Sequence, residues 1–231
     1  MVYITGDTHG DFSRFYKFSN KVKPTKADIM IILGDAGLNY YGNRLDALRK
    51  SEAAVLPMTF FCIHGNLEMR PEHIDSYKTK RFHGGTVWYE PDFPNLLFAR
   101  DGDVYRFGGR DCIVIGGAYS VDKFYRLQNG RQWFEDEQPS EAIKARVENT
   151  LAKRDYKIDT VLSHTCPIQY EPTEVFLPSI DQSTVDKSTE QWLGIIEQRL
   201  GYKAWYCGHY HTAKKIDKLR FMFEDIDVFG A

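Results

Sequence analysis

The sequence predicts an α/β fold in which a first half built as βαβαβ is followed by a more antiparallel half. The first 66 residues alternate short apolar runs with segments of helical periodicity. Four short motifs, each with a glycine beside a polar residue, mostly come directly after strand-like runs. These motifs are GDTHG (6–10), GDAG (34–37), GNLE (65–68) and GHYH (208–211).

The first half begins with two strands and a helix between them. Val2 to Thr5 is a short apolar run, and Asp28 to Leu33 is an isoleucine-rich run typical of a buried strand. Between them, Phe12, Phe15 and Tyr16 have the i, i+3, i+4 spacing of the apolar face of a helix. This order predicts a strand–helix–strand unit.

A second helix and a third strand follow. Leu45, Leu48 and Val55 lie on one helical face, and Asn43 is a candidate N-cap. Met58 to Ile63 reads as the third strand. A βαβαβ series implies parallel strands with right-handed crossovers. The motifs therefore lie at the carboxyl ends of strands, where open α/β sheets bind ligands.

The middle of the chain predicts a second sheet that is more antiparallel than the first. Turns such as Asp101-Gly102 and Gly108-Gly109 separate its short strand-like runs. These runs are residues 87–89, 96–99, 104–107 and 112–115.

Two helices and a closing strand are expected in the second half. Residues 140–151 have the apolar spacing of a helix. Ser188 and Gln191 resemble a capping box that opens another helix, which carries Trp192 inward. Residues 219–225 are expected to form the closing strand.

Two stretches, residues 119–139 and 170–187, show no clear period and are rich in turn-forming and aromatic residues. Loops of this length in a compact domain are often functional. The chain has no internal repeat, low-complexity segment or linker. We therefore expect residues 1–231 to form a single domain with long loops around 119–139 and 170–187.

Composition restricts the class of protein. Hydrophobic residues make up 42% and aromatic residues 14%, as in a globular protein. The net charge of −2 argues against a nucleic-acid partner. No apolar stretch approaches the roughly 20 residues of a membrane helix, and the motif at residue 6 leaves no room for a signal peptide. We therefore expect a cytoplasmic protein without a membrane partner.

Seven oxygen or imidazole side chains in or beside the motifs are candidate metal ligands. Any one motif alone would also fit an ordinary turn, so the ordered set carries the prediction. Carboxylate, amide and imidazole ligands without sulfur suit manganese, iron, zinc, cobalt or nickel. Seven residues suffice for two ions if one carboxylate bridges them. The candidates are Asp7, His9, Asp35, Asn66, His164, His209 and His211.

The ordered set resembles the signature of the calcineurin-like metallophosphoesterase superfamily: D-x-H, G-D, G-N-H-D/E, a lone His and G-H-x-H. The match spans nearly the whole chain. Residues 116–126, GGAYSVDKFYR, are similar to those of small bacterial and phage-type members. The resemblance implies a four-layer α/β/β/α sandwich with two mixed sheets. It also implies two divalent metal ions, with manganese or iron favoured and zinc, cobalt or nickel as alternatives.

The resemblance further implies how the ligands divide between the metals. One ion would be held by Asp7, His9, Asp35 and His211, and the other by Asp35, Asn66, His164 and His209. Asp35 would bridge them. The expected reaction is attack on a phosphate ester by a hydroxide that the two metals activate. The expected substrate is a phosphorylated protein or small molecule.

The chain departs from the family pattern at Leu67, where the family carries a His that assists the leaving group. A leucine can neither donate a proton nor steady the transition state, and general acid catalysis is worth ~10²–10⁴-fold. His64 lies two residues before Asn66, where related protein phosphatases often carry a phosphate-binding Arg. His64 is therefore a candidate catalytic or substrate-binding residue, and the alternative is a structural hydrogen bond.

Four further residues are candidate substrate ligands. Arg126 and Arg131 are able to clamp a phosphate through two hydrogen bonds each, and the alternative for both is an exposed loop position. Tyr119 and Asp122 follow the strand end near Gly117 and are expected to line the same pocket.

The leading hypothesis is a metal-dependent phosphomonoesterase that acts on a phosphorylated protein or small molecule. The nearest alternative is a phosphodiesterase or nuclease, which Leu67 favours and the low net charge disfavours. An alternative of another class is a non-catalytic interaction scaffold on the same fold. The complete set of candidate ligands argues against the scaffold.

Overall fold

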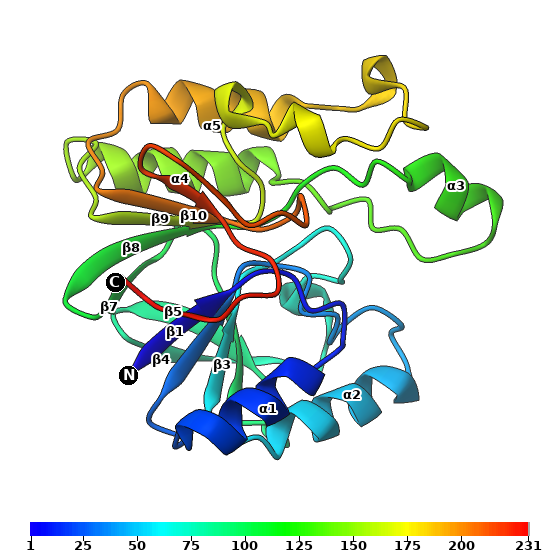
Figure 1. Ribbon diagram of the computed structural model, residues 1–231, viewed down its shortest axis with the longest axis vertical. Helices are drawn as coiled ribbons and strands as arrows, with labels where there is room; N and C mark the ends of the chain where they lie inside the picture. The colour runs from blue at the N-terminus through cyan, green and yellow to red at the C-terminus, as the bar shows by residue number, and fades with distance from the viewer. Residues whose placement is uncertain (231) are drawn as a thin grey trace.

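The computed structural model describes residues 1–230 and consists of four layers (Figure 1). Helices α1 and α2 cover one side, two sheets lie between, and α4 and α5 cover the other side. Helix α3 projects away from this body. The expected α/β/β/α sandwich with two mixed sheets is confirmed. The helices are α1 (Ser13–Val22), α2 (Arg44–Ala54), α3 (Lys123–Gln128), α4 (Glu141–Ala152) and α5 (Ser188–Glu197).

The first sheet has seven strands in the order β13-β1-β2-β3-β6-β5-β4. Its central strands β1, β2, β3 and β6 are parallel, and the remaining pairings are antiparallel. The bounds are β1 (Val2–Thr5), β2 (Ile29–Ile32), β3 (Thr59–Cys62), β4 (Lys78–Phe82), β5 (Gly85–Tyr89), β6 (Leu96–Ala99) and β13 (Asp227–Val228).

The second sheet has six strands in the order β11-β12-β10-β9-β8-β7. Strands β8, β9, β10 and β12 are parallel, and β7 and β11 are antiparallel edges. The bounds are β7 (Val104–Phe107), β8 (Arg110–Ile115), β9 (Thr160–Ser163), β10 (Ala204–Cys207), β11 (Lys214–Ile216) and β12 (Leu219–Phe221).

The expectation that all the middle strands belong to a second sheet is wrong for two of them. Strand β6 pairs in parallel with β3, with Phe60 opposite Leu96, and β5 pairs antiparallel with β6. All four residues of β6 are buried because the strand lies inside the first sheet. An apolar run of four residues has no feature that distinguishes one sheet from the other, so pairing could not be predicted from periodicity.

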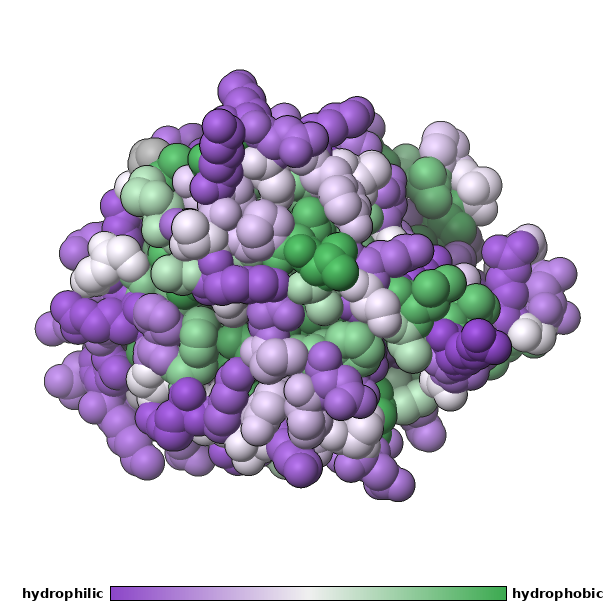
Figure 2. All heavy atoms as spheres, turned by 90° about the horizontal axis from the view of Figure 1, so that it is seen from below, coloured by the Kyte–Doolittle hydropathy of each residue, from purple (hydrophilic) through white to green (hydrophobic). Residues whose placement is uncertain are grey.

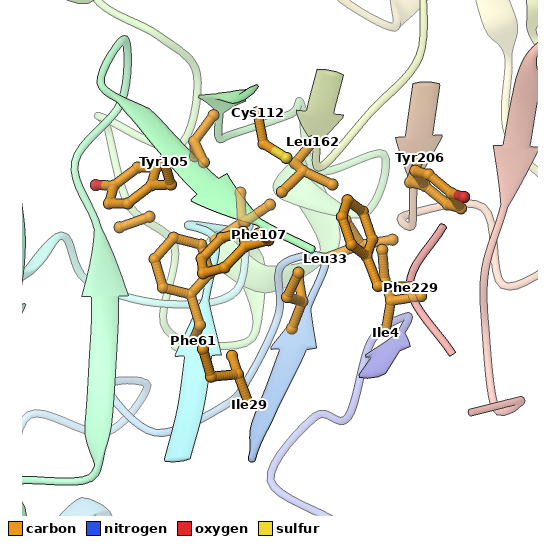
Figure 3. Close-up of a cluster of buried hydrophobic side chains, with 14 of the residues drawn as sticks. Ile4, Ile29, Leu33, Phe61, Tyr105, Phe107, Cys112, Leu162, Tyr206 and Phe229 are labelled. Atoms are coloured by element: carbon orange, nitrogen blue, oxygen red, sulfur yellow. The ribbon is translucent and has the colours of Figure 1, made fainter. Parts of the chain in front are cut away.

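The two sheets pack through a core rich in aromatic side chains (Figure 3). The ring centroid of Phe61 on β3 lies 4.9 Å from that of Phe107 and 4.8 Å from that of Tyr105, both at steep interplanar angles. Burying each of these rings contributes about 1.5–3 kcal/mol, which makes this layer the main contact between the sheets. Leu33 and Leu162 extend the same core from β2 and β9 toward the strand ends.

Helix α2 turns a different face inward from the one its leucines predict. Leu45, Leu48 and Val55 are exposed, whereas Asp46 and Lys50 are buried. Asp46 accepts hydrogen bonds from the backbone N–H groups of residues 41 and 42. Lys50 forms a 2.6 Å ion pair with Glu90. The long-range ion pair of Lys50 and the hydrogen bonds of Asp46 thus override the apolar stripe.

The surface on the side of α1 and α2 is mainly hydrophilic. Figure 2 views the molecule from this side and shows hydrophobic residues in separate patches among hydrophilic ones. Single apolar side chains at a protein surface are common and need no partner. The exposed leucines of α2 therefore do not by themselves indicate a docking surface.

Of the two predicted helix caps, one is confirmed and one is wrong. The Asn43 side chain accepts from the N–H of residue 45 as expected, and at α4, where no cap was predicted, the Ser140 hydroxyl accepts from the N–H of Ile143. The expected capping box at Ser188 is absent from the described residues, because Ser188 is the first helical residue and its hydroxyl donates to Gln138. Trp192 is buried as expected.

The two long loops carry little regular structure. Residues 119–139 contain only α3, and residues 170–187 contain single-turn 3₁₀ helices η3 (Thr173–Val175) and η4 (Gln182–Thr184). A further turn, η2 (Ile168–Tyr170), precedes them, and η1 (Pro71–His73) follows the third motif. Across residues 1–230, each helix is too short or too polar to span a lipid bilayer.

The buried pair of Lys50 and Glu90 generates a stability prediction. Lys50→Ala should lower the free energy of unfolding by about 3 kcal/mol, since it leaves the largely buried Glu90 carboxylate without its cationic partner. Leu48→Ala, on the exposed face of the same helix, should change it by less than about 0.5 kcal/mol. Urea denaturation of both variants measures the difference, and equal losses would contradict the observed orientation of α2.

Candidate metal centre

The seven candidate ligands converge at the carboxyl ends of strands from both sheets. Strands β1, β2 and β3 are neighbours in the first sheet, and β9 and β10 are neighbours in the second. Each is followed directly by a motif, so the residues meet where the two sheet edges face each other. The structure brings together Asp7, His9, Asp35, Asn66, His164, His209 and His211.

One group of ligand atoms comes from the first and last motifs. The Nε2 atoms of His9 and His211 lie 2.9 Å apart. His211 Nε2 lies 3.3 Å from Asp7 Oδ2, and His9 Nε2 lies 3.8 Å from the same oxygen. One ligand atom from each residue falls within 4.8 Å of the others, which is close enough for a shared cation.

A second group lies deeper. His164 Nε2 is 2.9 Å from Asn66 Oδ1 and 3.7 Å from Asp35 Oδ1. The other ring nitrogen of His164 lies 2.8 Å from the backbone oxygen of Leu33. A proton on that nitrogen donates to the carbonyl and leaves Nε2 free to act as a ligand. Asp7 takes part in this group as well as the first, so the two groups are adjacent.

His209 and Asn66 are oriented by neighbouring groups. The ring of His209 packs edge-on against that of His164 at 5.0 Å, and its backbone N–H donates to Asp7 Oδ1. The Asn66 amide nitrogen donates to the Ser120 hydroxyl at 2.8 Å, which directs the amide oxygen toward His164. Ser120 is a positioning residue that the sequence did not indicate.

The pKa values of the two carboxylates are shifted in opposite directions, although burial raises both. Burial raises the pKa of Asp7, but the contact with His211 and the charges of His164 and His9 outweigh it and hold the pKa at about 2. For Asp35, burial and the charge of Asp7 prevail and raise the pKa. Burial and nearby His164 lower the pKa of His209 to about 3, so its ring is neutral near pH 7 and suited to binding a cation.

These residues fit a pair of divalent ions. Asp7 Oδ2 is buried and accepts no well-formed hydrogen bond from the described residues. Leaving a buried carboxylate oxygen unpaired is costly, and a cation would satisfy it. The donors are carboxylate, amide and imidazole, without thiolate, which matches the preferences of manganese, iron or zinc.

The motif glycines let the ligand loops approach one another closely. A Cβ atom on Gly34 would lie 2.0 Å from His164 Nδ1, and one on Gly65 would lie 2.0 Å from Asp35 Oδ1. A Cβ on Gly208 would lie 2.3 Å from Asp7 Oδ1. Each of these glycines therefore makes room for a ligand from a different motif.

Glu68 is a supporting residue that sequence analysis did not single out, although it stands in the third motif. It is fully buried and accepts a hydrogen bond from the N–H of Gly65. Burial and the nearby charge of Asp35 raise its pKa to about 8. Since a protonated carboxyl is neutral, Glu68 can brace the ligand loops without adding a third charge to the site.

His64 lies apart from the ligand cluster. Its ring is buried beside Arg70, and burial followed by the charge of Arg70 holds its pKa well below the usual range. It lines a cavity that contains none of the seven candidate ligands. The structure therefore does not bring His64 together with them, and its role in the reaction stays a prediction.

The four candidate substrate ligands occupy different places. Tyr119 lines the same cavity as His209 and His211. Arg126 lies with His9 in a smaller cavity, where its guanidinium is paired with Asp122 at 2.7 Å.

Arg131, another of the four candidates, and Arg49, which was not a candidate, lie in different surroundings. Arg131 is exposed, stacks on Tyr125 of α3, and lines neither of the cavities beside the candidate ligands. Arg49, which the sequence did not indicate, lies in the small cavity with His9 and Arg126. Its position on the outward helix α2 gave no signal of this contact.

A cavity of about 310 Å³ adjoins the ligand cluster. Its walls are mainly apolar and come from the 170–187 loop, and His209 and His211 stand at its edge. Glu190 lies at its buried side, where Oε1 accepts from the Thr165 hydroxyl at 2.6 Å. Burial raises the pKa of Glu190 to about 7. The apolar wall residues are Val121, Val175, Phe176, Leu177, Ile180 and Val185.

The fold and this ligand cluster define a class of metal-dependent hydrolase built on a two-sheet sandwich. The family model of the calcineurin-like phosphoesterases matches residues 1–213. The chain therefore belongs to the calcineurin-like phosphoesterase family, whose members are phosphoric ester hydrolases that use divalent metal ions. No curated protein sequence matches it significantly.

Two solved structures are similar to this chain. The crystal structure of TT1561 of Thermus thermophilus is 13% identical, covers 96% of this chain and 87% of its own, and has a TM-score of 0.50. The phosphopantetheinyl hydrolase PptH from Mycobacterium tuberculosis is 15% identical, with coverage of 96% and 87% and a TM-score of 0.46. At this identity, the first comparison supports the fold alone.

The close approach at Gly65 predicts a metal-binding defect. Gly65→Ala should displace the Asp35 carboxylate and weaken metal binding at least about tenfold, because the new methyl group overlaps Asp35 Oδ1. Gly201→Ala is the control, since its Cβ would meet nothing nearer than 3.7 Å. Metal content after equilibrium dialysis against Mn²⁺ measures both, and unchanged binding in the first variant would contradict the packing.

The raised pKa of Glu190 predicts a pH-dependent stability. Between about pH 4.5 and 7 the unfolded chain loses this proton while the folded protein keeps it, so stability falls as pH rises through that window. The free energy of unfolding should fall by up to about 3 kcal/mol across this window, and Glu190→Gln should abolish that fall. Exposed Glu135→Gln should leave it intact. Urea midpoints at pH 5 and 8 test this, and identical profiles would refute it.

Proposed function

We propose that this phosphoesterase hydrolyses phosphate monoesters whose alcohol carries an apolar or aromatic group. The observation that carries the proposal is the mainly apolar cavity of about 310 Å³ beside His209 and His211. A substrate with its phosphate at the ligand cluster would place its organic part against these walls. Apolar surface buried there contributes about 25 cal/mol per Å² to binding.

The seven candidate ligands are proposed to hold two divalent ions, manganese or iron, with Asp35 between them. When bound, such ions bind phosphoryl oxygens, activate water near neutral pH and stabilise in-line displacement. The chain itself orients the ligands: the N–H of Leu67 donates to Asp35 Oδ1 at 2.8 Å, and Leu33 fixes the His164 ring. Preorganised ligands need no rearrangement during the reaction.

Substrate selection would rest on the loop that forms the cavity wall. Phe176 stacks on Tyr210 with ring centroids 6.1 Å apart, and Tyr210 lies between two candidate ligands in the sequence. An aromatic substrate group can extend this stack. A small-molecule or side-chain phosphate of this type fits the cavity better than a highly charged polymer does.

A phosphodiester is the second candidate substrate, and a specific feature favours it. A smaller cavity of about 170 Å³ is lined by His9 together with Tyr40, Tyr41, Leu67 and Arg126. A diester has two organic substituents, and the two cavities are lined by different candidate ligands, His9 in one and His209 and His211 in the other. Leu67 in this second wall also offers no proton donor to a poor leaving group.

The proposal is tested with protein that has been stripped of metal and reloaded with Mn²⁺. It should hydrolyse 1-naphthylmethyl phosphate with a higher kcat/KM than ethyl phosphate, since both esters release an alkoxide and differ mainly in the apolar group. Phe176→Ala should lower kcat/KM for the naphthylmethyl ester about tenfold and leave ethyl phosphate nearly unchanged. Exposed Leu127→Ala on α3 is the control. Faster hydrolysis of bis(4-nitrophenyl) phosphate than of either monoester would favour the diesterase instead, and no turnover with both metals bound would exclude both.

The missing proton donor at Leu67 generates a second prediction. Leu67→His should raise turnover of alkyl phosphates by ~10²-fold or less and change aryl phosphates little, because alkoxides need protonation and aryl oxides do not. Leu67→Asn, which fills similar space without an acid, is the matched control. Equal effects of both variants on both ester classes would show that the leucine does not limit leaving-group departure.

A further inference from the structure

A cavity of about 370 Å³ lies apart from the ligand cluster. It is formed by the segment after β3 with η1, by strands β4 to β6 of the first sheet, and by helix α4. None of the seven candidate ligands lines it, and it shares no lining residue with the two cavities at the metal centre. It is therefore a separate site rather than an extension of the first.

Buried hydrogen-bonding groups without partners line this cavity. His64 is 3% exposed, and neither of its ring nitrogens has a hydrogen-bond partner among the described residues. Arg70 is also 3% exposed, and its Nη2 likewise has no partner there. An unsatisfied buried polar group costs about 1–3 kcal/mol, so three at one wall indicate a ligand that completes them.

The other groups of Arg70 are already engaged and hold it in place. Its Nη1 pairs with Asp101 Oδ2 at 2.7 Å, and its Nε donates to the backbone oxygen of Asp136 at 2.9 Å. The other carboxylate oxygen of Asp101, Oδ1, accepts a hydrogen bond from the N–H of Gly116 at 2.6 Å. The ion pair with Asp101 therefore fixes the orientation of the Arg70 guanidinium, whose Nη2 has no partner among the described residues.

Positive charge prevails around the cavity. Arg70, Arg100 and Arg146 line it, against Asp101 and Glu72. Within residues 1–230, the Arg100 side chain has no ion pair. Three cations against two anions favour an anionic ligand, and guanidinium groups bind carboxylate and phosphate through paired hydrogen bonds.

The rest of the lining includes large apolar side chains, and the cavity is larger than an inorganic anion alone requires. Trp88, Phe98 and Ile143 face the cavity beside the arginines. An arrangement of apolar walls with a few convergent polar groups is typical of sites for small organic molecules. The volume leaves room for a ring or short chain attached to the acidic group.

We propose that this cavity binds a small organic oxyanion, with its acidic group on His64, Arg70, Arg100 and Arg146 and its apolar part on Trp88 and Phe98. A carboxylate and a phosphate monoester share this chemistry. The proposal goes beyond the phosphoesterase reaction and does not depend on it.

Trp88 provides a readout that is independent of catalysis. Benzoate and phenylphosphonate, as the carboxylate and phosphate probes, are titrated into the metal-loaded protein while the indole N–H resonance of Trp88 is followed by NMR, assigned with Trp88→Phe. At least one probe should give a saturable shift, and which one binds more tightly identifies the acidic group. Uncharged benzyl alcohol should give none.

Variants at the rim test the role of charge. Arg100→Gln and Arg146→Gln should each weaken the binding of the bound probe about tenfold. Arg199→Gln, on an exposed arginine that stacks on Tyr156, is the control for general loss of charge. Unchanged melting temperatures would establish that the variants fold. The proposal is overturned if neither probe gives a saturable shift, or if both rim variants bind it as tightly as the wild type.

Discussion

The candidate metal centre depends on the absence of side chains at three positions. Gly34, Gly65 and Gly208 each lie where a Cβ atom would overlap a candidate ligand from another motif. Backbone and ligand are consequently in van der Waals contact around the site. This packing joins strand ends of the first sheet to strand ends of the second, so the sheets can take only one relative position at this edge.

The order of the strands in the two sheets places the candidate ligands at this contact. Parallel strands β1, β2 and β3 deliver Asp7, Asp35 and Asn66 side by side, and β9 and β10 deliver histidines opposite them. Two buried carboxylates close together repel each other, and Glu68 lies behind them with its pKa raised to about 8. A protonated Glu68 adds no third negative charge to this part of the core.

The ordered motifs at strand ends predicted the seven candidate ligands, and the resemblance of these motifs to the family signature implied the four layers. It did not predict that β5 and β6 extend the first sheet, since short apolar runs carry no information about partners. It also misjudged helix α2, where the buried Lys50 depends on Glu90, a residue 40 positions away. Ring orientation at His64 likewise depends on tertiary packing against Arg70, which no spacing rule describes.

The wall of the 310 Å³ cavity beside the ligand cluster differs in construction from the candidate metal centre. The ligands are held by strand ends within a hydrogen-bonded sheet, whereas Val175, Phe176 and Leu177 belong to a loop with only single 3₁₀ turns. Insertions and substitutions are tolerated far better in such a loop than in a central strand. In the proposed function, catalysis and substrate choice therefore depend on separate segments of the chain. Evolution, or a protein engineer, can remodel the loop to accept a new ester without disturbing the chemistry that cleaves it.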